Sequence, residues 1–181
     1  MSWDATNSDI IGASALLPVF DSRGPVPKAS AGLLLFRFVN GTPEVLLVHP
    51  GGPFWTRRDD GAWMIPKGEI GIGEEPLDAA RREFTEETGA TASGEFIALQ
   101  PRRQAGGKLV HAWAVVGEFD PARLTSTTFN MEWPPRSGKQ KAFPEVDRAV
   151  WLTFSDARQK ILDSQRGFLD ELEEILKQRA V

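Results

Sequence analysis

The stretch that most constrains this chain runs from Pro66 to Ala90, with the sequence PKGEIGIGEEPLDAARREFTEETGA. It holds seven acidic residues and only two arginines, Arg81 and Arg82; the acidic residues are Glu69, Glu74, Glu75, Asp78, Glu83, Glu86 and Glu87. Carboxylates at this density repel one another and raise one another's pKa. An ordinary solvated surface does not require such a density, so the stretch predicts a site that uses negative charge.

A helix is expected inside this stretch. Pro76 suits the first helical position because it lacks an N–H and its φ is pre-set, and Gly89 suits the residue just past the C-terminus. A helical period places an apolar face on one side, made of Leu77, Ala80, Phe84 and Thr88.

The carboxylates of Glu83, Glu86 and Glu87 share a different arc of the same helix, about 100° wide. Spaced at i, i+3 and i+4, they destabilise the helix unless a cation lies among them. Oxygen ligands without Cys or a nearby His favour Mg²⁺, or alternatively Mn²⁺, over zinc or copper. The helix therefore predicts a divalent-metal site, and an acidic surface helix is the plainer alternative.

The whole stretch resembles the Nudix box, G-x5-E-x7-R-E-U-x-E-E-x-G-U with U apolar, at every defined position. The matching residues are Gly68, Glu74, Arg82, Glu83, Phe84, Glu86, Glu87, Gly89 and Ala90. The resemblance implies an α/β class of fold, a Nudix α/β/α sandwich with a mixed central sheet, the box helix on one face and C-terminal helices. It also implies metal-dependent hydrolysis of a nucleoside diphosphate linked to another group.

The resemblance further implies roles for individual residues. Glu83, Glu86 and Glu87 are the expected metal ligands, joined by a backbone carbonyl near Lys67 or Gly68. Arg82 and Glu74 are expected around them, with Arg82 pairing to a box carboxylate and fixing its orientation. Glu83, Glu145 and Asp147 are the candidates for the general base, and Glu145 is favoured over Asp147 as the loop carboxylate. For Glu145 and Asp147 the alternative is a structural role, in which the acid caps a strand or pairs with Arg148.

Substrate contacts are expected from basic and aromatic residues outside the helix. Lys67 is the favoured phosphate contact because it adjoins Gly68, and the other basic candidates, each alternatively a solvated charge, are Arg57, Arg58, Arg102, Arg103, Lys108, Arg136 and Lys139. Aromatic faces stack on purines, which makes candidates of Phe54, Trp55, Trp63 and Trp133. Core or structural positions are expected for Trp113, Trp151, His49 and His111.

Composition excludes several classes of protein and partner. The net charge of −4 is concentrated in the acidic stretch, and no basic run predicts a long nucleic-acid partner. The absence of Cys excludes disulfides and Cys-ligated zinc ribbons. No stretch approaches the ~20 apolar residues of a membrane span. Ile10–Phe20 is a poor signal peptide because Asp4 and Asp9 precede it instead of Lys or Arg, so a cytoplasmic protein without membrane contact is expected.

Along the chain, residues 1–28 are expected to be a tail or an extra strand, and residues 29–181 a single Nudix hydrolase domain. Asn40-Gly41 predicts a hairpin between strands at 30–39 and 44–49. The other expected strands are 63–66, 95–100, 109–119 and 148–154, with long loops at about 50–62 and 120–144. Ser155 is the expected N-cap of a helix over 156–162, and an apolar stripe predicts a last helix at about 165–178.

The leading functional hypothesis is a Mg²⁺-dependent pyrophosphohydrolase that cleaves a dinucleoside polyphosphate. The PKGE start of the box is similar to the diadenosine and diphosphoinositol polyphosphate branches of the family. Hydrolysis of oxidised or other nucleoside triphosphates to monophosphate and pyrophosphate is one alternative. A non-catalytic ligand-sensing module is another, although a sensor does not need the complete box. The segments HPGGPFW, EWPPRSGK and FPEVDRAVW resemble a bacterial subgroup of predicted nucleotide pyrophosphohydrolases. The sequence makes no prediction of the oligomeric state.

Overall fold

A mixed sheet of six strands forms the centre of the molecule. The computed structural model describes residues 29–104 and 106–179, so the expectation for residues 1–28 lies outside the described part. The strand order is β4-β5-β1-β2-β8, with β3 paired to the beginning of β1. The bounds are β1 Ala29–Val39, β2 Thr42–Pro50, β3 Lys67–Glu69, β4 Ile97–Arg103, β5 Leu109–Val116 and β8 Val146–Thr153. Only β1 and β5 pair in parallel; the other pairs are antiparallel.

The predicted hairpin between β1 and β2 is confirmed, with Val39 opposite Thr42. Asn40 and Gly41 both have positive φ, 50° and 80°. Two consecutive positive φ values define the tight turn whose twist matches that of the strands, which is why Asn-Gly predicts it well.

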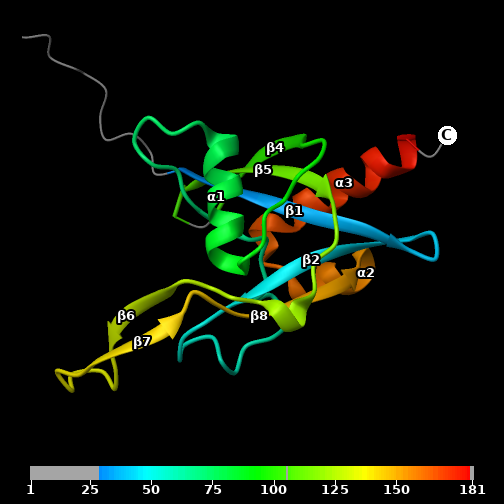
Figure 1. Cartoon of the computed structure of the whole chain (residues 1–181). Coiled ribbons are helices and arrows are strands. Elements are labelled where there is room, and N and C mark those ends of the chain that lie inside the picture. The colour runs from blue at the N-terminus through cyan, green and yellow to red at the C-terminus, as the bar shows by residue number, and fades with distance from the viewer. Residues whose placement is uncertain (1–28, 105, 180–181) are drawn as a thin grey trace, which may run out of the picture.

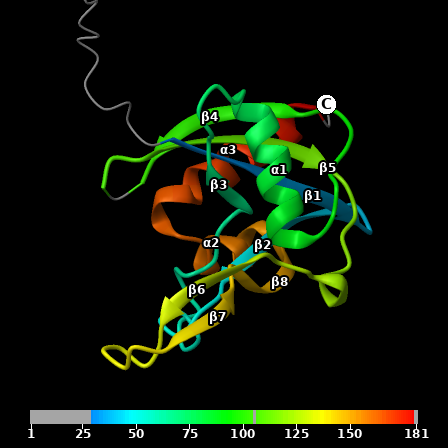
Figure 2. The ribbon, with the colours of Figure 1, turned by 60° about the vertical axis from the view of Figure 1, so that its left-hand side comes forward.

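Helices cover both faces of the sheet (Figures 1 and 2). Helix α1, Pro76–Thr88, packs on one face, and α2, Phe154–Lys160, and α3, Arg166–Arg179, pack on the other. The alternation of side chains along β1 explains both layers: Leu33 and Leu35 contact the α1 side, whereas Leu34 and Phe36 contact the α2 and α3 side. The expected α/β/α sandwich with a mixed sheet is confirmed.

The ends of α1 fall where the sequence places them. Pro76 is the first helical residue, and Gly89 follows the helix with a left-handed φ of 77° while its N–H donates to the Thr85 carbonyl. Ala80, Phe84 and Thr88 are buried on the sheet side.

The region predicted as a loop over 120–144 contains a separate two-stranded hairpin, which is a correction. Strands β6, Thr128–Glu132, and β7, Gln140–Pro144, pair antiparallel and project from the body of the molecule as a hairpin arm (Figure 1). β6 has a short alternation, with Phe129 and Met131 between exposed polar residues, which the loop prediction missed, whereas β7 is mostly exposed and shows no such pattern. A turn of 3-10 helix, η1 at Pro121–Arg123, precedes the arm.

Other element boundaries also differ from the sequence expectation. The N-cap of α2 is Thr153, whose hydroxyl accepts from the Asp156 N–H, and not Ser155. The expected strand at 63–66 is reduced to isolated bridges at Trp63 and Met64, and continuous pairing begins at Lys67. β4 lies later than expected, β5 ends earlier, and η2, Asp163–Gln165, precedes α3. No helix in the described ranges is long and apolar enough to cross a membrane.

Phe84 joins α1 to the sheet, and its replacement measures how much that contact stabilises the fold. Because Phe84 is 1% exposed, Phe84→Ala is expected to lower the free energy of unfolding by about 3–5 kcal/mol. Urea denaturation followed by circular dichroism measures this change. Phe38→Ala is the matched control, since Phe38 is 51% exposed, and it is expected to cost much less. Equal losses in the two variants would contradict the packing described.

Candidate metal and phosphate site

The backbone of β3 lies directly against the carboxylates of α1. The N–H of Lys67 donates to Glu87 Oε2 at 2.9 Å. At Gly68, a Cβ would lie 1.8 Å from Glu83 Oε2, so only glycine permits this approach. Pairing between β3 and β1 fixes the position of both residues.

Arg82 connects most of the acidic residues of the stretch. Its Nε and Nη2 donate to the two oxygens of Glu74 at 2.8 and 2.9 Å. Its Nη1 donates to Glu83 at 2.7 Å and to Glu86 at 3.0 Å. Nη2 also donates to the Glu69 carbonyl at 3.0 Å. A planar guanidinium can make such a set of bonds, whereas an ammonium cannot.

Glu74 anchors this network on the loop before α1. Its two carboxylate oxygens accept from Nε and Nη2 of Arg82, and the carboxylate also accepts the N–H of Gly71 at 2.7 Å. These bonds, with that from Arg82 the strongest, hold the pKa of Glu74 at about 2. Glu74 therefore remains charged and fixes Arg82, as the box resemblance implies.

Burial perturbs the acids on the inner side of α1. Glu83 is 8% exposed and Glu87 is 5% exposed. Burial raises the pKa of Glu87 to about 8, against the opposing effect of the nearby Lys67 ammonium and N–H. Burial also raises the pKa of Glu83 and lowers that of the Lys67 ammonium. Like charges add to the effect on Glu83 and Glu87, so a cation placed among these groups would be strongly favoured.

Glu145 faces this cluster from the end of β7. Its negative charge contributes to the raised pKa of both Glu83 and Glu87. One oxygen accepts the hydroxyl of Thr127 at 2.9 Å, and the Thr127 N–H donates to the Glu86 carbonyl at 2.9 Å. The root of the hairpin arm is thereby attached to α1 beside the carboxylates.

Asp147 is directed elsewhere. Its Oδ1 lies 2.8 Å from His49 Nδ1 and 3.4 Å from Arg148 Nε. The structure therefore brings Glu145, and not Asp147, toward the α1 carboxylates. The pairing of Asp147 with Arg148 matches the structural role that was the alternative for that acid.

The donor set fits a hard divalent cation. No three Asp, Glu, His or Cys side chains in the described part of the chain already converge as a metal cage. Instead, Arg82 Nη1 bridges Glu83 and Glu86, and Glu87 accepts the Lys67 N–H. The Glu83 carboxylate occupies the space where a Cβ of residue 68 would lie, so Gly68 lets this acid approach the β3 backbone. Carboxylate and carbonyl oxygens are the ligands that Mg²⁺ and Mn²⁺ prefer.

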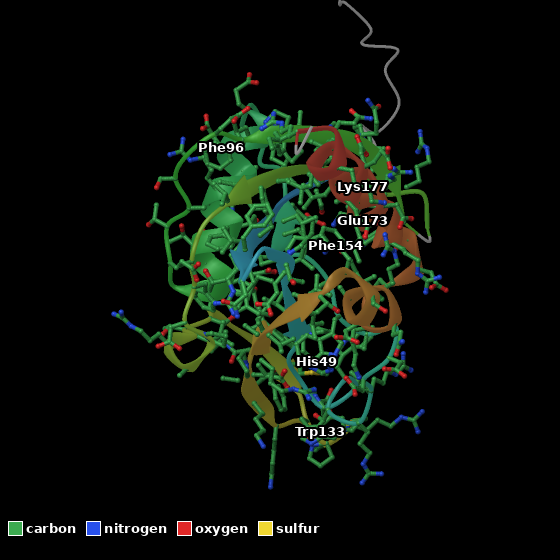
Figure 3. All side chains as sticks on the ribbon, turned by 90° about the vertical axis from the view of Figure 1, so that its right-hand side faces the viewer. His49, Phe96, Trp133, Phe154, Glu173 and Lys177 are labelled. Atoms are coloured by element: carbon green, nitrogen blue, oxygen red, sulfur yellow. The ribbon has the colours of Figure 1, made fainter. Side chains whose placement is uncertain are left out.

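Two of the predicted aromatic candidates meet, although they are far apart in sequence. Phe54 and Trp133 pack edge to face with ring centroids 5.7 Å apart. Trp55 is half-buried, and the Arg58 guanidinium lies 5.2 Å from the centre of its ring. Arg57, Arg136 and Lys139 are exposed on the same loop and arm. Figure 3 labels Trp133 at the end of the molecule away from Phe96.

Several other candidates have structural partners. Trp63 is buried and donates its indole N–H to Asp59, so the interpretation as a base-stacking platform is wrong. Arg102 binds Glu171 and the Gly167 carbonyl, and Lys108 binds Glu69. Trp113 and Trp151 pack against the buried cluster on the α1 side, as expected.

Two hollows on the described surface do not contain the carboxylates. Cavities of about 600 and 680 Å³ share Glu118, Phe119 and Asp120, beyond the C-terminal end of α1. The chemistry, and not the size of a cavity, therefore locates the candidate site. Thr127 and His49, which contact residues of this region, were missed from the sequence because their contacts depend on pairings between distant segments.

The sheet thus lies between helix layers, and α1 holds its carboxylates against the backbone of β3 at Gly68. A family model described as the NUDIX domain matches residues 26–172. The match covers most of the sequence, and the chain belongs to the Nudix family.

Curated relatives match shorter segments. An RNA pyrophosphohydrolase of Bartonella bacilliformis is 70% identical over 27 residues, which are 15% of this chain and 16% of the relative. An RNA pyrophosphohydrolase of Cereibacter sphaeroides is 44% identical over 61 residues, 32% of this chain and 38% of the relative. The chain spans less than half of the length of the curated relatives that it matches.

Solved structures share the fold over most of the chain. An Ap4A hydrolase binary complex from C. elegans has a TM-score of 0.58 and 22% identity, covering 83% of this chain and 98% of that one. The NUDIX domain of Shewanella oneidensis NrtR, complexed with ADP ribose, has a TM-score of 0.60 and 17% identity, covering 84% and 90%. At these identities the likeness concerns the fold alone.

The raised pKa of Glu87 predicts a pH dependence of stability in protein kept free of metal by a chelator. Between the ordinary carboxyl value of 4.5 and about 8, the folded state holds a proton that the unfolded state has released. The free energy of unfolding is therefore expected to fall as the pH rises through this window. Urea denaturation at pH 5 and pH 8 measures the slope.

Glu87→Gln should flatten this slope because the glutamine does not titrate. Glu174→Gln, which replaces an exposed glutamate of α3, is the matched control and should leave the slope unchanged. A Glu87→Gln slope equal to that of the unmodified protein would contradict the proposed burial of the charge.

Proposed function

We propose that the protein is a pyrophosphohydrolase that requires Mg²⁺, or Mn²⁺ in its place, and cleaves a nucleoside diphosphate linked to another group. The single observation that carries the proposal is that Arg82 bridges Glu83 and Glu86 while Glu83 and Glu87 lie against the β3 backbone at Gly68 and Lys67. Membership of the Nudix family and the names of the curated relatives support it.

In this proposal Glu83, Glu86 and Glu87 hold the metal together with the carbonyl of Gly68 or Lys67. When bound, the cation neutralises charge on the phosphate oxygens and acidifies water. Arg82 keeps the oxygens of Glu83 and Glu86 oriented. Lys67 places positive charge beside the leaving phosphate.

Glu145 is the proposed general base. A new bond forms between water oxygen and phosphorus while the phosphoric anhydride bond breaks, and the proton of the water passes to the Glu145 carboxylate. The Thr127 hydroxyl, which donates to Glu145 Oε2 at 2.9 Å, keeps the other oxygen of that carboxylate directed toward the cluster.

The hairpin arm favours a long substrate. Five residues of β7 separate Glu145 from the tip, and a strand rises ~3.3 Å per residue. A base stacked on Trp133, beside Phe54, would lie along this arm, nearer to Glu145 than the ~17 Å to the tip, because the Trp133 ring packs against Phe143 with centroids 6.4 Å apart. Arg57 on the neighbouring loop and Arg136 and Lys139 at the tip of the arm are exposed and would supply positive charge to the phosphates. A dinucleoside polyphosphate spans the distance between Glu145 and this base contact better than a nucleoside triphosphate, which is the second candidate substrate. A sensor module would hydrolyse neither compound.

A substrate panel in Mg²⁺ or Mn²⁺ tests this proposal. The panel comprises dinucleoside polyphosphates, canonical and oxidised nucleoside triphosphates, ADP-ribose, diphosphoinositols and 5′-triphosphorylated RNA. Fastest turnover is expected with a dinucleoside polyphosphate, with products identified by chromatography and mass spectrometry. Glu86→Gln and Glu87→Gln should each lower turnover by more than the ~10–100-fold that loss of an outer partner costs at metal sites. No turnover of any compound, or full activity of these variants, would overturn the proposal.

The base is tested by a second pair of variants. Glu145→Gln is expected to lower kcat by about 10²–10⁴-fold, the usual contribution of a positioned base. Asp147→Asn should cost less, because Asp147 faces His49 and its amide replacement can still accept a hydrogen bond. Steady-state kinetics at saturating metal measures both. The reverse order would reject Glu145 as the base.

A further inference from the structure

His49 is a buried histidine with a hydrogen-bond acceptor at each ring nitrogen. The residue is 0% exposed. Nδ1 lies 2.8 Å from Asp147 Oδ1, and Nε2 lies 2.8 Å from the Arg58 carbonyl oxygen. The two ring nitrogens of His49 therefore join the Asp147 carboxylate to the backbone of Arg58. In Figure 3 His49 lies between Phe154 of α2 and Trp133 of the hairpin arm.

The position of Asp147 depends on an irregularity in the pairing of β2 with β8. His49 pairs with Arg148, but the next residue, Pro50, pairs with Val146, which leaves Asp147 as an extra residue. Such a bulge re-aims side chains, and bulges recur beside active sites. In a regular strand Glu145 and Asp147 would point to the same face. Here Asp147 turns to His49, whereas Glu145 turns to Thr127 and the α1 carboxylates.

The backbone of Glu145 belongs to the same assembly. Its carbonyl accepts the N–H of Gly51 at 2.9 Å, and its N–H donates to the Thr127 carbonyl at 2.9 Å. Gly51 follows His49 by two residues, and a Cβ there would lie 2.0 Å from the Pro144 carbonyl oxygen. Gly51, just past the end of β2, is therefore in direct contact with both Pro144 and Glu145.

Neighbouring groups keep His49 in place. The Trp63 ring packs against the imidazole with centroids 5.2 Å apart. The Arg148 guanidinium lies 5.3 Å from the centre of the Trp63 ring, and its Nε lies 3.4 Å from Asp147 Oδ1. Through Arg58, His49 also holds the segment that carries Phe54 and Trp55.

We propose that His49 is a positioning residue for Glu145. The imidazole binds Asp147, stabilises the bulge and so fixes the direction of Glu145 toward the α1 carboxylates, without itself touching the substrate. The inference rests on the proposed function, in which Glu145 is the base.

Two conservative replacements separate the two hydrogen bonds of His49. The amide nitrogen of Asn is the same number of bonds from Cα as Nδ1, and that of Gln the same number as Nε2. His49→Asn therefore retains a donor to Asp147, and His49→Gln retains a donor to the Arg58 carbonyl. If the bond to Asp147 positions Glu145, kcat should fall by less than ~10-fold in the Asn variant and by up to ~100-fold in the Gln variant, the scale of a 1 Å misplacement.

The affinity for Mn²⁺, measured by calorimetry, should be the same in both variants because the metal ligands lie on α1. In the Glu145→Gln background, His49→Gln should cause no further loss of kcat, since the group that it positions is already gone. A purely structural role would instead lower kcat in both backgrounds by the same factor.

A readout without substrate completes the test. Exchange of the Gly51 amide hydrogen, which is bonded to the Glu145 carbonyl, should be faster in the Gln variant than in the Asn variant. If either His49 variant fails to fold, Asp147→Asn and Asp147→Leu serve in its place, because the first keeps an acceptor for Nδ1 and the second removes it. The Leu variant should then show the lower kcat and the faster exchange.

The outcomes distinguish the inference from the proposed function. If the unmodified protein turns over no member of the substrate panel, or if Glu145→Gln is fully active, the proposed function fails. If the unmodified protein is active and Glu145→Gln is not, equal kcat and equal Gly51 exchange in the paired variants would overturn the role of His49. A further loss of kcat on adding His49→Gln to Glu145→Gln would overturn it as well.

Discussion

Electrostatic repulsion among Glu83, Glu86, Glu87 and Glu145 is the constraint on which the site depends. Two of these carboxylates are buried, and their raised pKa values express the energetic cost of that burial. Arg82 offsets part of the repulsion by bridging Glu83 and Glu86, and the backbone of β3 offsets another part by donating to Glu87. The β1–β3 pairing therefore has an electrostatic role, because it holds those backbone groups against the helix.

The parts of the site that the sequence predicted are those encoded by local spacing. Pro76 and Gly89 mark the helix ends through backbone properties of single residues, and Arg82 reaches Glu83 and Glu86 because they are one and four positions away on the same helix. The nearly continuous apolar run of β1 predicted a central strand for the same reason. A match to the Nudix box is informative because nearly all of its contacts lie within one short segment.

The parts that the sequence did not predict depend on how distant segments pair. Nothing in the residues near His49 indicates that Asp147, far along the chain, will turn toward it, since this requires the bulge between β2 and β8. Trp63 looks like an exposed platform beside a glycine-rich loop, yet packing against His49 and the bond to Asp59 bury it. The strands of the hairpin arm escaped prediction because they are exposed and stabilised mainly by each other.

The proposed chemistry depends on contacts within one segment, whereas the choice of substrate depends on contacts between distant segments. The groups proposed to bind the metal lie on one helix and one short strand, so their geometry survives changes elsewhere in the chain. Glu145 and the aromatic residues near Trp133 instead lie on a hairpin that is attached to α1 through Thr127 and to β2 through Gly51. Changes in the length or sequence of the arm would move the nucleoside contacts relative to a fixed cleavage site. Because its tip extends from the sheet, the arm can vary without disturbing the core, and substrate choice is therefore expected to depend on the arm more than on the box.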